Sequence, residues 1–325
     1  MKQTLYTVAE VSAMIIEGKK LLLAGDAGLL SQLPKGDWIG ACSWRYIIFP
    51  EKRVETHEKI FAVALPDFVT GTSIREYDAD NIKNIFNDGP KNGFTILTMP
   101  FGSPVAVEYI TNAVNYENFA VHPVCGGISG DPFSPEKLVV ASGTGPNIYT
   151  DKAVAMHVSL PENKFAEMHL FSPYKQGPGD SIKFDYSGLV LDDAYINGVR
   201  RNFVEYLTEI QYAPHSMPFV ANYSGETISL IIGRIDDDKL LMVSPVFENI
   251  EYRMAVIDDS ISEPTLIGDK IFFSASCISN YGSPEFCDRF LKKMNGPIVF
   301  GEIAYQMVGY TTVYLTIDDV QNRKP

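Results

Sequence analysis

Cysteine and long hydrophobic runs are scarce in this chain. Four cysteines among 325 residues are too few for the disulfide framework of a secreted scaffold. The longest apolar runs, such as Leu21–Ala24 and Ile228–Ile232, are far shorter than the roughly 20 residues that cross a bilayer. Because Met1–Gly18 has no apolar stretch behind basic residues, we expect no secretory signal. These absences predict a cytoplasmic protein.

The chain has fewer basic than acidic residues. The chain has 27 Lys and Arg against 40 Asp and Glu, which gives a formal net charge of −13. A field of this sign repels nucleic acid and anionic lipid, so we expect neither nucleic acid nor a membrane as a partner. The hydrophobic fraction of 46% is enough for a large core, built as one long domain or as two packed halves.

Several motifs of established chemistry are missing. There is no phosphate loop ending in Gly-Lys-Ser/Thr, no Cys-x-x-Cys metal spacing, no serine elbow and no zinc-protease helix. The acidic run Asp236–Asp238 lacks the glycine and distal glutamate of a calcium loop and reads as a charged hairpin tip. Without a Cys-x-x-Cys-His sequence any haem would be noncovalent. We predict no bound cofactor.

The first half of the chain alternates between strand and helix signals. Thr7 and Glu10 form a capping box that opens a helix ending at Gly18, and Ser103-Pro104 opens another that runs to about Asn112. A third helix is expected over 80–87. The strands are expected over 19–24, 37–46, 59–65, 93–99 and 119–125. This alternation allows some of the strands to be parallel.

The second half begins with antiparallel signals. Residues 153–160 and 164–171 flank Pro161–Asn163, and 227–235 and 239–246 flank Asp236–Asp238, so both pairs are predicted as hairpins. A helix is expected from Asp192 or Asp193 through Ile210, another is expected from Ser283-Pro284 until Gly296-Pro297 stops it, and the chain then ends in strands over 298–305 and 311–317.

A stretch rich in Pro, Gly, Ser and Thr, 131–150, separates the two halves. We therefore predict halves at 1–150 and 151–325. The expected fold class is α+β, with mixed β-sheets and flanking helices, and the two halves are expected to pack closely around a shared cleft.

Four short segments rich in small residues are the most informative feature of the sequence. Gly, Ser and Ala let a ligand or another backbone approach the main chain closely. We interpret three of the segments as strand ends that turn sharply, and we expect all four to meet at the mouth of one cavity. The segments are Ile39–Ser43, Cys125–Pro132, Phe273–Asn280 and Phe300–Tyr305.

In that order, the four segments resemble the FIST sensory domain, a family with an N-terminal and a C-terminal half. The resemblance covers nearly the whole chain and implies a small-molecule-binding input module, not an enzyme. Because the sequence resembles no kinase, cyclase or receptor segment, we expect its signal to pass to a separate partner protein or through oligomer contacts. One departure is that Asn280–Gly282 stands where the family often has an Arg-Gly step. If that arginine binds a carboxylate in relatives, this chain binds a different ligand or binds it differently.

The candidate ligand-binding residues lie in and beside these segments. We call Gly126–Gly130 the glycine element. Its clustered backbone N–H groups could hold an anion, or the element could be a plain turn. Glu302, inside an apolar strand, would accept hydrogen bonds from a ligand or from backbone donors, because a buried carboxylate is costly unless paired. The full set is Gly40, Cys42, Arg45, His122, Cys125, Gly126, Gly127, Ser129, Ser276, Cys277, Gly301 and Glu302.

Other readings of the same residues stay open. Arg45 could bind a carboxylate, or pair with one of the many surface acids. His157 and His169 could face each other across the first hairpin and share a metal, although a solvated pair is favoured on register grounds. Cys125 or Cys42 with His122 could form a nucleophilic pair of an enzyme. His122 could instead ligate haem.

Overall fold

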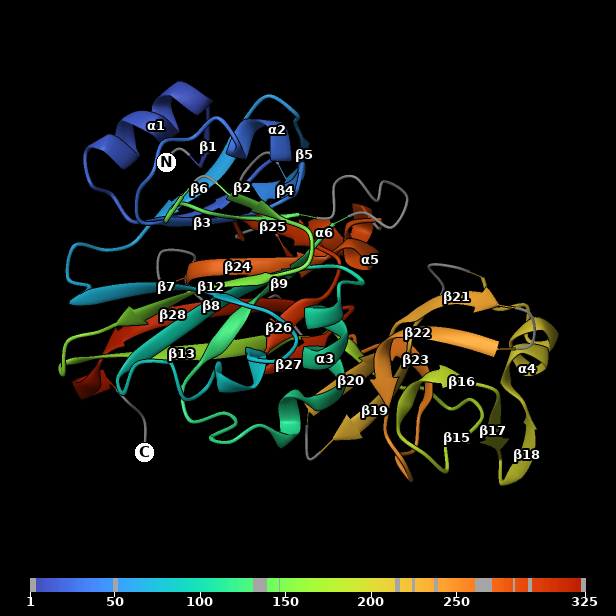
Figure 1. The fold of residues 1–325 in the computed structure, drawn as a ribbon. Helices are drawn as coiled ribbons and strands as arrows, with labels where there is room; N and C mark the ends of the chain where they lie inside the picture. The colour runs from blue at the N-terminus through green and yellow to red at the C-terminus, as the bar shows by residue number, and fades with distance from the viewer. Residues whose placement is uncertain are drawn as a thin grey trace. The chain divides into compact units, whose positions relative to one another are not determined.

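The computed structural model describes residues 4–48, 52–130, 139–145, 147–213, 217–223, 226–236, 239–260, 271–282, 284–291 and 294–322 (Figure 1). The chain forms two compact units. The first comprises Met1–Phe171, Glu263–Gln306 and Thr312–Pro325, and the second comprises Ser172–Ser262 and Met307–Thr311. Each unit is described separately.

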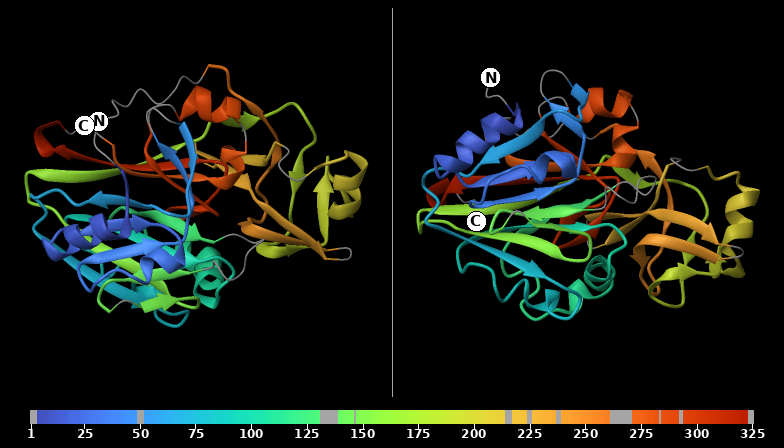
Figure 2. Two further views of the ribbon diagram at one scale, coloured as in Figure 1. Left: turned by 90° about the horizontal axis from the view of Figure 1, so that it is seen from above. Right: turned by 45° about the horizontal axis from the view of Figure 1, so that its top comes forward.

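The first sheet of the first unit holds a β-α-β element. Strands β2 and β3 are parallel neighbours, and the short helix α2 (Ala27–Leu30) connects them. Helix α1 (Val8–Ile16) covers the outer face of the sheet (Figure 2), and its predicted capping box is present between Thr7 and Glu10. In spatial order the strands are β1 (Leu5–Tyr6), β6 (Ile60–Ala64), β2 (Leu21–Ala24), β3 (Trp38–Ala41), β10 (Val140–Ser142) and β11 (Asn147–Tyr149).

The second sheet carries the most deeply buried strands. Every residue of β8 and β9 is buried, which explains the near-continuous apolar run of 93–99. Successive side chains of β8 point to opposite faces of the sheet. Helix α3 (Pro104–Asn112) and the 3₁₀ turn η1 (Ile82–Asn84) lie beside this sheet. The spatial order is β27 (Gln306–Val308), β26 (Glu302–Ala304), β9 (Val124–Ser129), β8 (Gly93–Pro100), β12 (Ala153–Ser159) and β7 (Gly71–Tyr77).

The third sheet joins the two ends of the sequence. Strand β25 is parallel to β24 on one side and antiparallel to β4 on the other. Two short helices follow β24 in the chain, α5 (Ile278–Tyr281) and α6 (Pro284–Phe290). Two further 3₁₀ turns are η2 (Ala113–Asn115), after α3, and η4 (Val320–Asn322), after β28. The spatial order is β13 (Lys164–Phe171), β28 (Thr312–Asp319), β24 (Ile271–Cys277), β25 (Gly296–Val299), β4 (Arg45–Ile48) and β5 (Lys52–Glu55).

The predicted α+β class with mixed sheets is confirmed. Each of the three sheets combines one parallel pair with antiparallel neighbours: β2 with β3, β8 with β9, and β24 with β25. Within the described part of the chain, no helix is both long and apolar enough to cross a bilayer.

The predicted hairpin over 153–171 is wrong. Strand β12 pairs with β7 and β8 in the second sheet, whereas β13 pairs with β28 in the third. The turn at Pro161–Asn163 therefore carries the chain from one sheet to another. Strands β12 and β13 therefore complete sheets of the first unit. As a result, the compact units do not coincide with the predicted halves 1–150 and 151–325.

The second unit is built from three small antiparallel sheets around one aromatic core. Fully buried Phe184, Phe203, Phe219 and Tyr252 lie at its centre, and α4 (Phe203–Glu209) contributes the second of these. The sheets are β14 (Tyr174–Gln176), β23 (Arg253–Ile257), β19 (Phe219–Tyr223) and β20 (Glu226–Leu230); β15 (Ile182–Lys183), β17 (Asp193–Ile196) and β18 (Val199–Asn202); and β16 (Gly188–Leu191), β22 (Lys239–Val246) and β21 (Ile232–Asp236).

The predicted hairpin around Asp236 is confirmed for 232–246, since β21 pairs with β22; residues 237 and 238 of its tip lie outside the described residues. The strand expected over 227–235 is two strands, because β20 pairs with β19 in another sheet. The predicted helix over 192–210 is wrong in its first half. Residues 193–202 form the hairpin β17–β18, because Asn197 and Gly198 both take positive φ, +50° and +82°, as a tight primed turn requires.

Replacing Gly198 by alanine is expected to lower the free energy of unfolding by about 1 kcal/mol, because an L side chain pays for left-handed φ. A Cβ there would meet no atom within 4 Å, so the cost is conformational alone. Gly179→Ala is the matched control, since its Cβ is equally unobstructed and its φ is not left-handed. Urea titrations of the two variants measure the difference, and equal midpoints would contradict the assigned turn.

Three further elements differ from expectation. The strand predicted over 37–46 is two strands, β3 and β4, and the helix predicted over 80–87 is reduced to η1. Gly296 and Pro297 do not end a helix but form part of β25, where they pair with Ile47 and Tyr46. Ser283, the expected cap of α6, lies outside the described residues.

Candidate functional site

The four segments rich in small residues come together in the first unit. The Cys42 amide donates to Ser129 Oγ at 2.8 Å, and Ser43 Oγ donates to the carbonyl of Ile298 at 2.9 Å. In the ladders, Glu302 lies opposite Gly127 and Cys277 opposite Val299. The last two residues of the second segment, Asp131 and Pro132, are outside the described residues.

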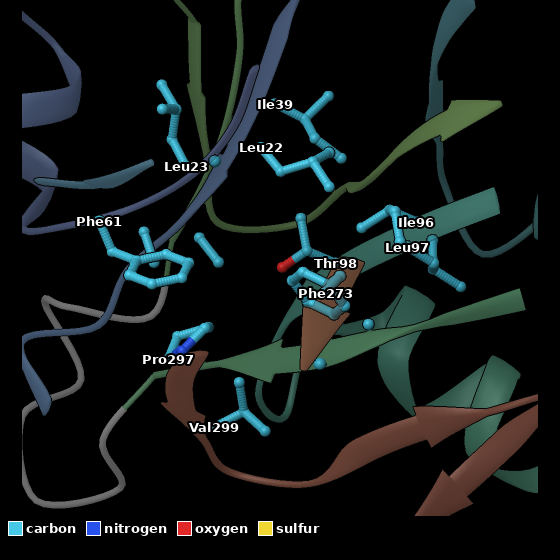
Figure 3. Close-up of a pocket in the computed structure, with 15 residues that line it drawn as sticks. Leu22, Leu23, Ile39, Phe61, Ile96, Leu97, Thr98, Phe273, Pro297 and Val299 are labelled. Atoms are coloured by element: carbon cyan, nitrogen blue, oxygen red, sulfur yellow. The ribbon is translucent and has the colours of Figure 1, made fainter. Parts of the chain in front are cut away.

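A small pocket lies where these segments meet (Figure 3). Its volume is about 40 Å³, and its walls come from β2 and β3 on one side and from β8 and β9 on the other. The third segment contributes Phe273, and β25 contributes Pro297 and Val299. The lining side chains are aliphatic or aromatic, with one exception, Thr98.

The Thr98 hydroxyl is the polar group of this pocket. The residue is 5% exposed, and its Oγ1 is buried without a hydrogen-bond partner. In Figure 3 the hydroxyl oxygen points into the space between Phe61 and Phe273. A buried hydroxyl without a partner costs on the order of 1–3 kcal/mol, so this position is destabilised until something in the pocket satisfies it.

The sequence did not single out Thr98. Its signal is indirect: alternation along the buried strand 93–100 puts Thr98 and Ile96 on one face and Thr95 on the other. Which face looks into a pocket depends on the ladder of β8 with β9, and that ladder pairs residues far apart in sequence.

The glycine element is a strand and not a turn at the end of one. Strand β9 runs straight through Gly126, Gly127 and Ser129 between β8 and β26. The Ile128 amide donates to the carbonyl of Gly301 at 2.8 Å, so part of this backbone is committed to the ladder. The predicted strand over 119–125 is wrong in its first half, because β9 begins at Val124.

Close approach explains the two glycines. A Cβ on Gly126, whose φ is +151°, would lie 1.9 Å from the carbonyl oxygen of Leu97, and a Cβ on Gly127 would lie 2.5 Å from the Val299 side chain. At Gly40 a Cβ would lie 3.3 Å from Leu30. All three glycines concerned line the pocket, so their missing side chains set the spacing of its walls.

Glu302 is fully buried and stands one strand away from the pocket. It pairs with Gly127, which in turn pairs with Thr98, so the three residues form one row on the same face of the sheet. Glu302 is not among the residues that line the pocket.

A comparison with known families matches residues 6–318 to the family of unknown function DUF6976. The chain belongs to this family. Among curated proteins, none matches the chain. The resemblance to the FIST sensory domain stays a prediction.

Three other predicted ligand residues do not line the pocket. The Arg45 guanidinium pairs with Glu55 at 3.1 Å and lies over the Trp44 ring at 5.3 Å, which is the surface ion pair weighed above. Ser276 Oγ lies 3.0 Å from Thr312 Oγ1, and Ser129 Oγ donates to the carbonyl of Val139. Each of these polar groups already has a protein partner.

All four cysteines are buried as free thiols, Cys42, Cys125, Cys277 and Cys287. Burial raises the pKa of Cys125 far above its usual value and raises the pKa of Cys287 to about 11. A thiol with such a pKa is not ionised at neutral pH, and the thiolate is the nucleophile. None of the four lines the pocket.

His122 is also committed to the protein interior. It is 5% exposed, its Nε2 lies 3.0 Å from Thr95 Oγ1, and a Cβ on Gly89 would lie 2.0 Å from its ring. Burial lowers its pKa. Because the backbone of residue 89 and Thr95 occupy the surroundings of this ring, the geometry favours neither a haem ligand nor a base for Cys125.

The cross-strand pairing of His157 with His169 is wrong, both as the favoured solvated pair and as the alternative metal site. The two residues lie on strands of different sheets: His157 pairs with Ser73 and Thr95, and His169 with Tyr314. His169 Nε2 lies 3.1 Å from Thr316 Oγ1. In the described ranges no group of three or more His, Cys, Asp or Glu side chains could hold a metal ion.

Proposed function

We propose that this protein is a small-molecule sensor, a signal-input protein that binds its ligand noncovalently in the pocket beside Thr98. The observation that carries the proposal is the convergence of the small-residue segments on a cavity with one unsatisfied hydroxyl. Occupancy of that cavity would be passed to a separate signalling protein. The shared cleft of the two predicted halves is, on this proposal, the pocket itself, since 22–127 and 273–299 both line it.

Size and polarity narrow the ligand. A volume of about 40 Å³ exceeds the roughly 10–15 Å³ that one water requires, but is well below the roughly 300–1,000 Å³ of pockets for drug-sized ligands. Water is held poorly, because a buried water typically makes about three hydrogen bonds and the lining offers one side-chain partner. The proposed ligand therefore has a few heavy atoms, is mainly apolar, and carries one hydrogen-bonding group.

The cysteine-enzyme and haem-sensor alternatives lack a comparable observation. Cys125 is fully buried with a raised pKa, and His122 is 5% exposed with its Nε2 3.0 Å from Thr95 Oγ1. We therefore retain noncovalent binding.

Methyl NMR tests the proposal with 1-propanol and xenon as probes. We expect saturable shift changes at the methyl groups of Leu22, Ile39, Ile96 and Val299, which line the pocket. Thr98→Val should weaken the binding of 1-propanol at least several-fold while leaving xenon unaffected, because only the alcohol uses the hydroxyl. Thr72→Val, on the edge strand β7, is the matched control. Unsaturable changes, or changes spread over the whole first unit, would reject the site.

A further inference from the structure

A continuous chain of hydrogen bonds runs through the second sheet on the face opposite Thr98. We call it the histidine chain, made of Asp88, Tyr77, His157, Thr95 and His122. The Tyr77 hydroxyl donates to Asp88 Oδ2 at 2.9 Å and lies 2.9 Å from His157 Nε2. Thr95 Oγ1 lies 2.8 Å from His157 Nδ1 and 3.0 Å from His122 Nε2.

Counting protons gives this chain one direction. The Asp88 carboxylate can only accept hydrogen bonds, so the Tyr77 hydroxyl donates its proton to Asp88. Tyr77 must then accept a hydrogen bond from the Nε2–H of His157. A neutral His157 then accepts at Nδ1 from the Thr95 hydroxyl. Thr95, having spent its proton, accepts from the Nε2–H of His122. Every bond is therefore satisfied only while His157 is neutral and both imidazoles carry a proton on Nε2.

The chain begins at the surface and ends in the interior. Asp88 also pairs with Arg75 at 2.8 Å, and their side chains are 20% and 51% exposed. The four inner members are almost fully buried, with Tyr77 and His157 each 3%, Thr95 0% and His122 5% exposed. Two titratable rings are thus held deep in the unit by a single set of proton positions.

The segment that carries His122 is mostly exposed but is held at several points. Asn118 Nδ2 donates to Asn87 Oδ1, Asn87 Nδ2 donates to Glu117 Oε2, and the Phe119 ring packs against Phe86 and Tyr305. Residues 117, 118, 120 and 121 are exposed, and Phe119 is half-buried. Asn118 and Ala120 both hold positive φ, +59° and +62°, and for alanine this conformation is strained. Its hydrogen bonds are exposed and its buried contacts are confined to Phe119 and His122, so the bond from His122 to Thr95 is one of the contacts that resist local opening.

We propose that the histidine chain is a proton-operated contact: uptake of a proton by His157 reverses its bond with Thr95 and loosens residues 117–122, which the chain ties to the second sheet through His122. A second proton on His157 turns its Nδ1 from an acceptor into a donor that faces the Thr95 hydroxyl. Thr95 must then turn its own proton away and accept from both histidines, which leaves that buried proton without its acceptor. The proposal is independent of the pocket and its ligand.

The charges around the two rings support this reading. The pKa of His157 is lowered to about 4, mainly by burial; the His122 ring and Arg75 also lower it, and Asp88 opposes them. Burial also lowers the pKa of His122. The remaining titratable neighbours are Tyr77, whose pKa is raised by burial and by its bond to Asp88, and Glu117, which accepts from Asn87 at 3.1 Å.

Hydrogen–deuterium exchange on the full chain tests the release. With rates normalised to intrinsic exchange, we expect amides of 117–124 to exchange at least tenfold faster at pH 5.0 than at pH 7.5, while those of β2 and β3 stay unchanged. Long-range ¹H–¹⁵N spectra should show His122 and His157 both protonated on Nε2 alone at pH 7.5. A segment whose exchange does not rise on acidification, or a ring protonated on Nδ1, overturns the proposal without any variant.

Two substitutions sharpen the test. In His157→Gln the side-chain amide can replace part of the ring's hydrogen bonding but cannot take up a proton, so the acceleration at pH 5.0 should disappear. His169→Gln is the matched control, because this histidine also bonds a threonine but lies outside the chain, and it should keep the acceleration. If both variants keep the acceleration, the histidine chain is not the proton-sensitive element.

Discussion

Replacing Thr95 by valine is expected to lower the free energy of unfolding by about 3 kcal/mol. The substitution keeps the shape of the side chain but leaves His157 Nδ1 and the Nε2–H of His122 without their partner. Each buried polar group left unsatisfied costs on the order of 1–3 kcal/mol. Chemical denaturation monitored on the first unit measures the loss.

Thr98→Val is the matched comparison, with the opposite sign. Thr98 lies on the same strand, is also buried, and has a hydroxyl without a partner. Removing that hydroxyl should raise the free energy of unfolding of the ligand-free protein by about 1 kcal/mol. If the two valine variants change stability by the same amount, either the direction assigned to the histidine chain or the unsatisfied state of Thr98 is wrong.

Acidification is expected to destabilise the first unit well above the range in which carboxylates titrate. A histidine with a pKa near 6.5 in the unfolded chain and about 4 in the folded chain binds a proton only after unfolding at intermediate pH. The stabilisation from His157 is therefore complete above about pH 6.5 and declines as the pH falls toward 4. Between pH 7.5 and pH 5.0 the loss is about 2 kcal/mol.

His157→Gln checks this assignment. The variant should be less stable than the parent at pH 7.5, because the glutamine cannot reproduce both ring contacts, and its stability should vary less between pH 7.5 and pH 5.0. Denaturation midpoints at several pH values measure both effects. An unchanged pH dependence in this variant would mean that other groups carry the titration.

Local signals predicted a good part of the fold. The capping box at Thr7 and the Ser103-Pro104 start are present, because a cap depends on residues within one turn of each other. Strand β8 followed from its continuous apolar run, and the Asp236 hairpin followed from its short polar connection. Each of these elements is decided by residues close together in sequence.

Elements decided by distant partners were not predictable in the same way. Pro161–Asn163 has the same turn signal whether the next strand pairs back or enters another sheet. Gly126 and Gly127 read as a turn because small residues favour one, yet here they admit Leu97 and Val299 at close range. The histidine chain could not be predicted because it depends on β12 lying between β7 and β8. No spacing of residues along the sequence indicates this strand order.

Strand β8 separates the pocket on one face of the second sheet from the histidine chain on the other. Thr98 on one side faces the cavity, and Thr95, three residues earlier, holds both imidazoles on the other. A displacement of this strand that widened the cavity would be felt by the imidazoles, and the converse holds with equal free energy, because thermodynamic coupling between two events is reciprocal. On the two proposals above, occupancy of the pocket and acidity would act on the same strand, so the response to either should be measured at a fixed value of the other.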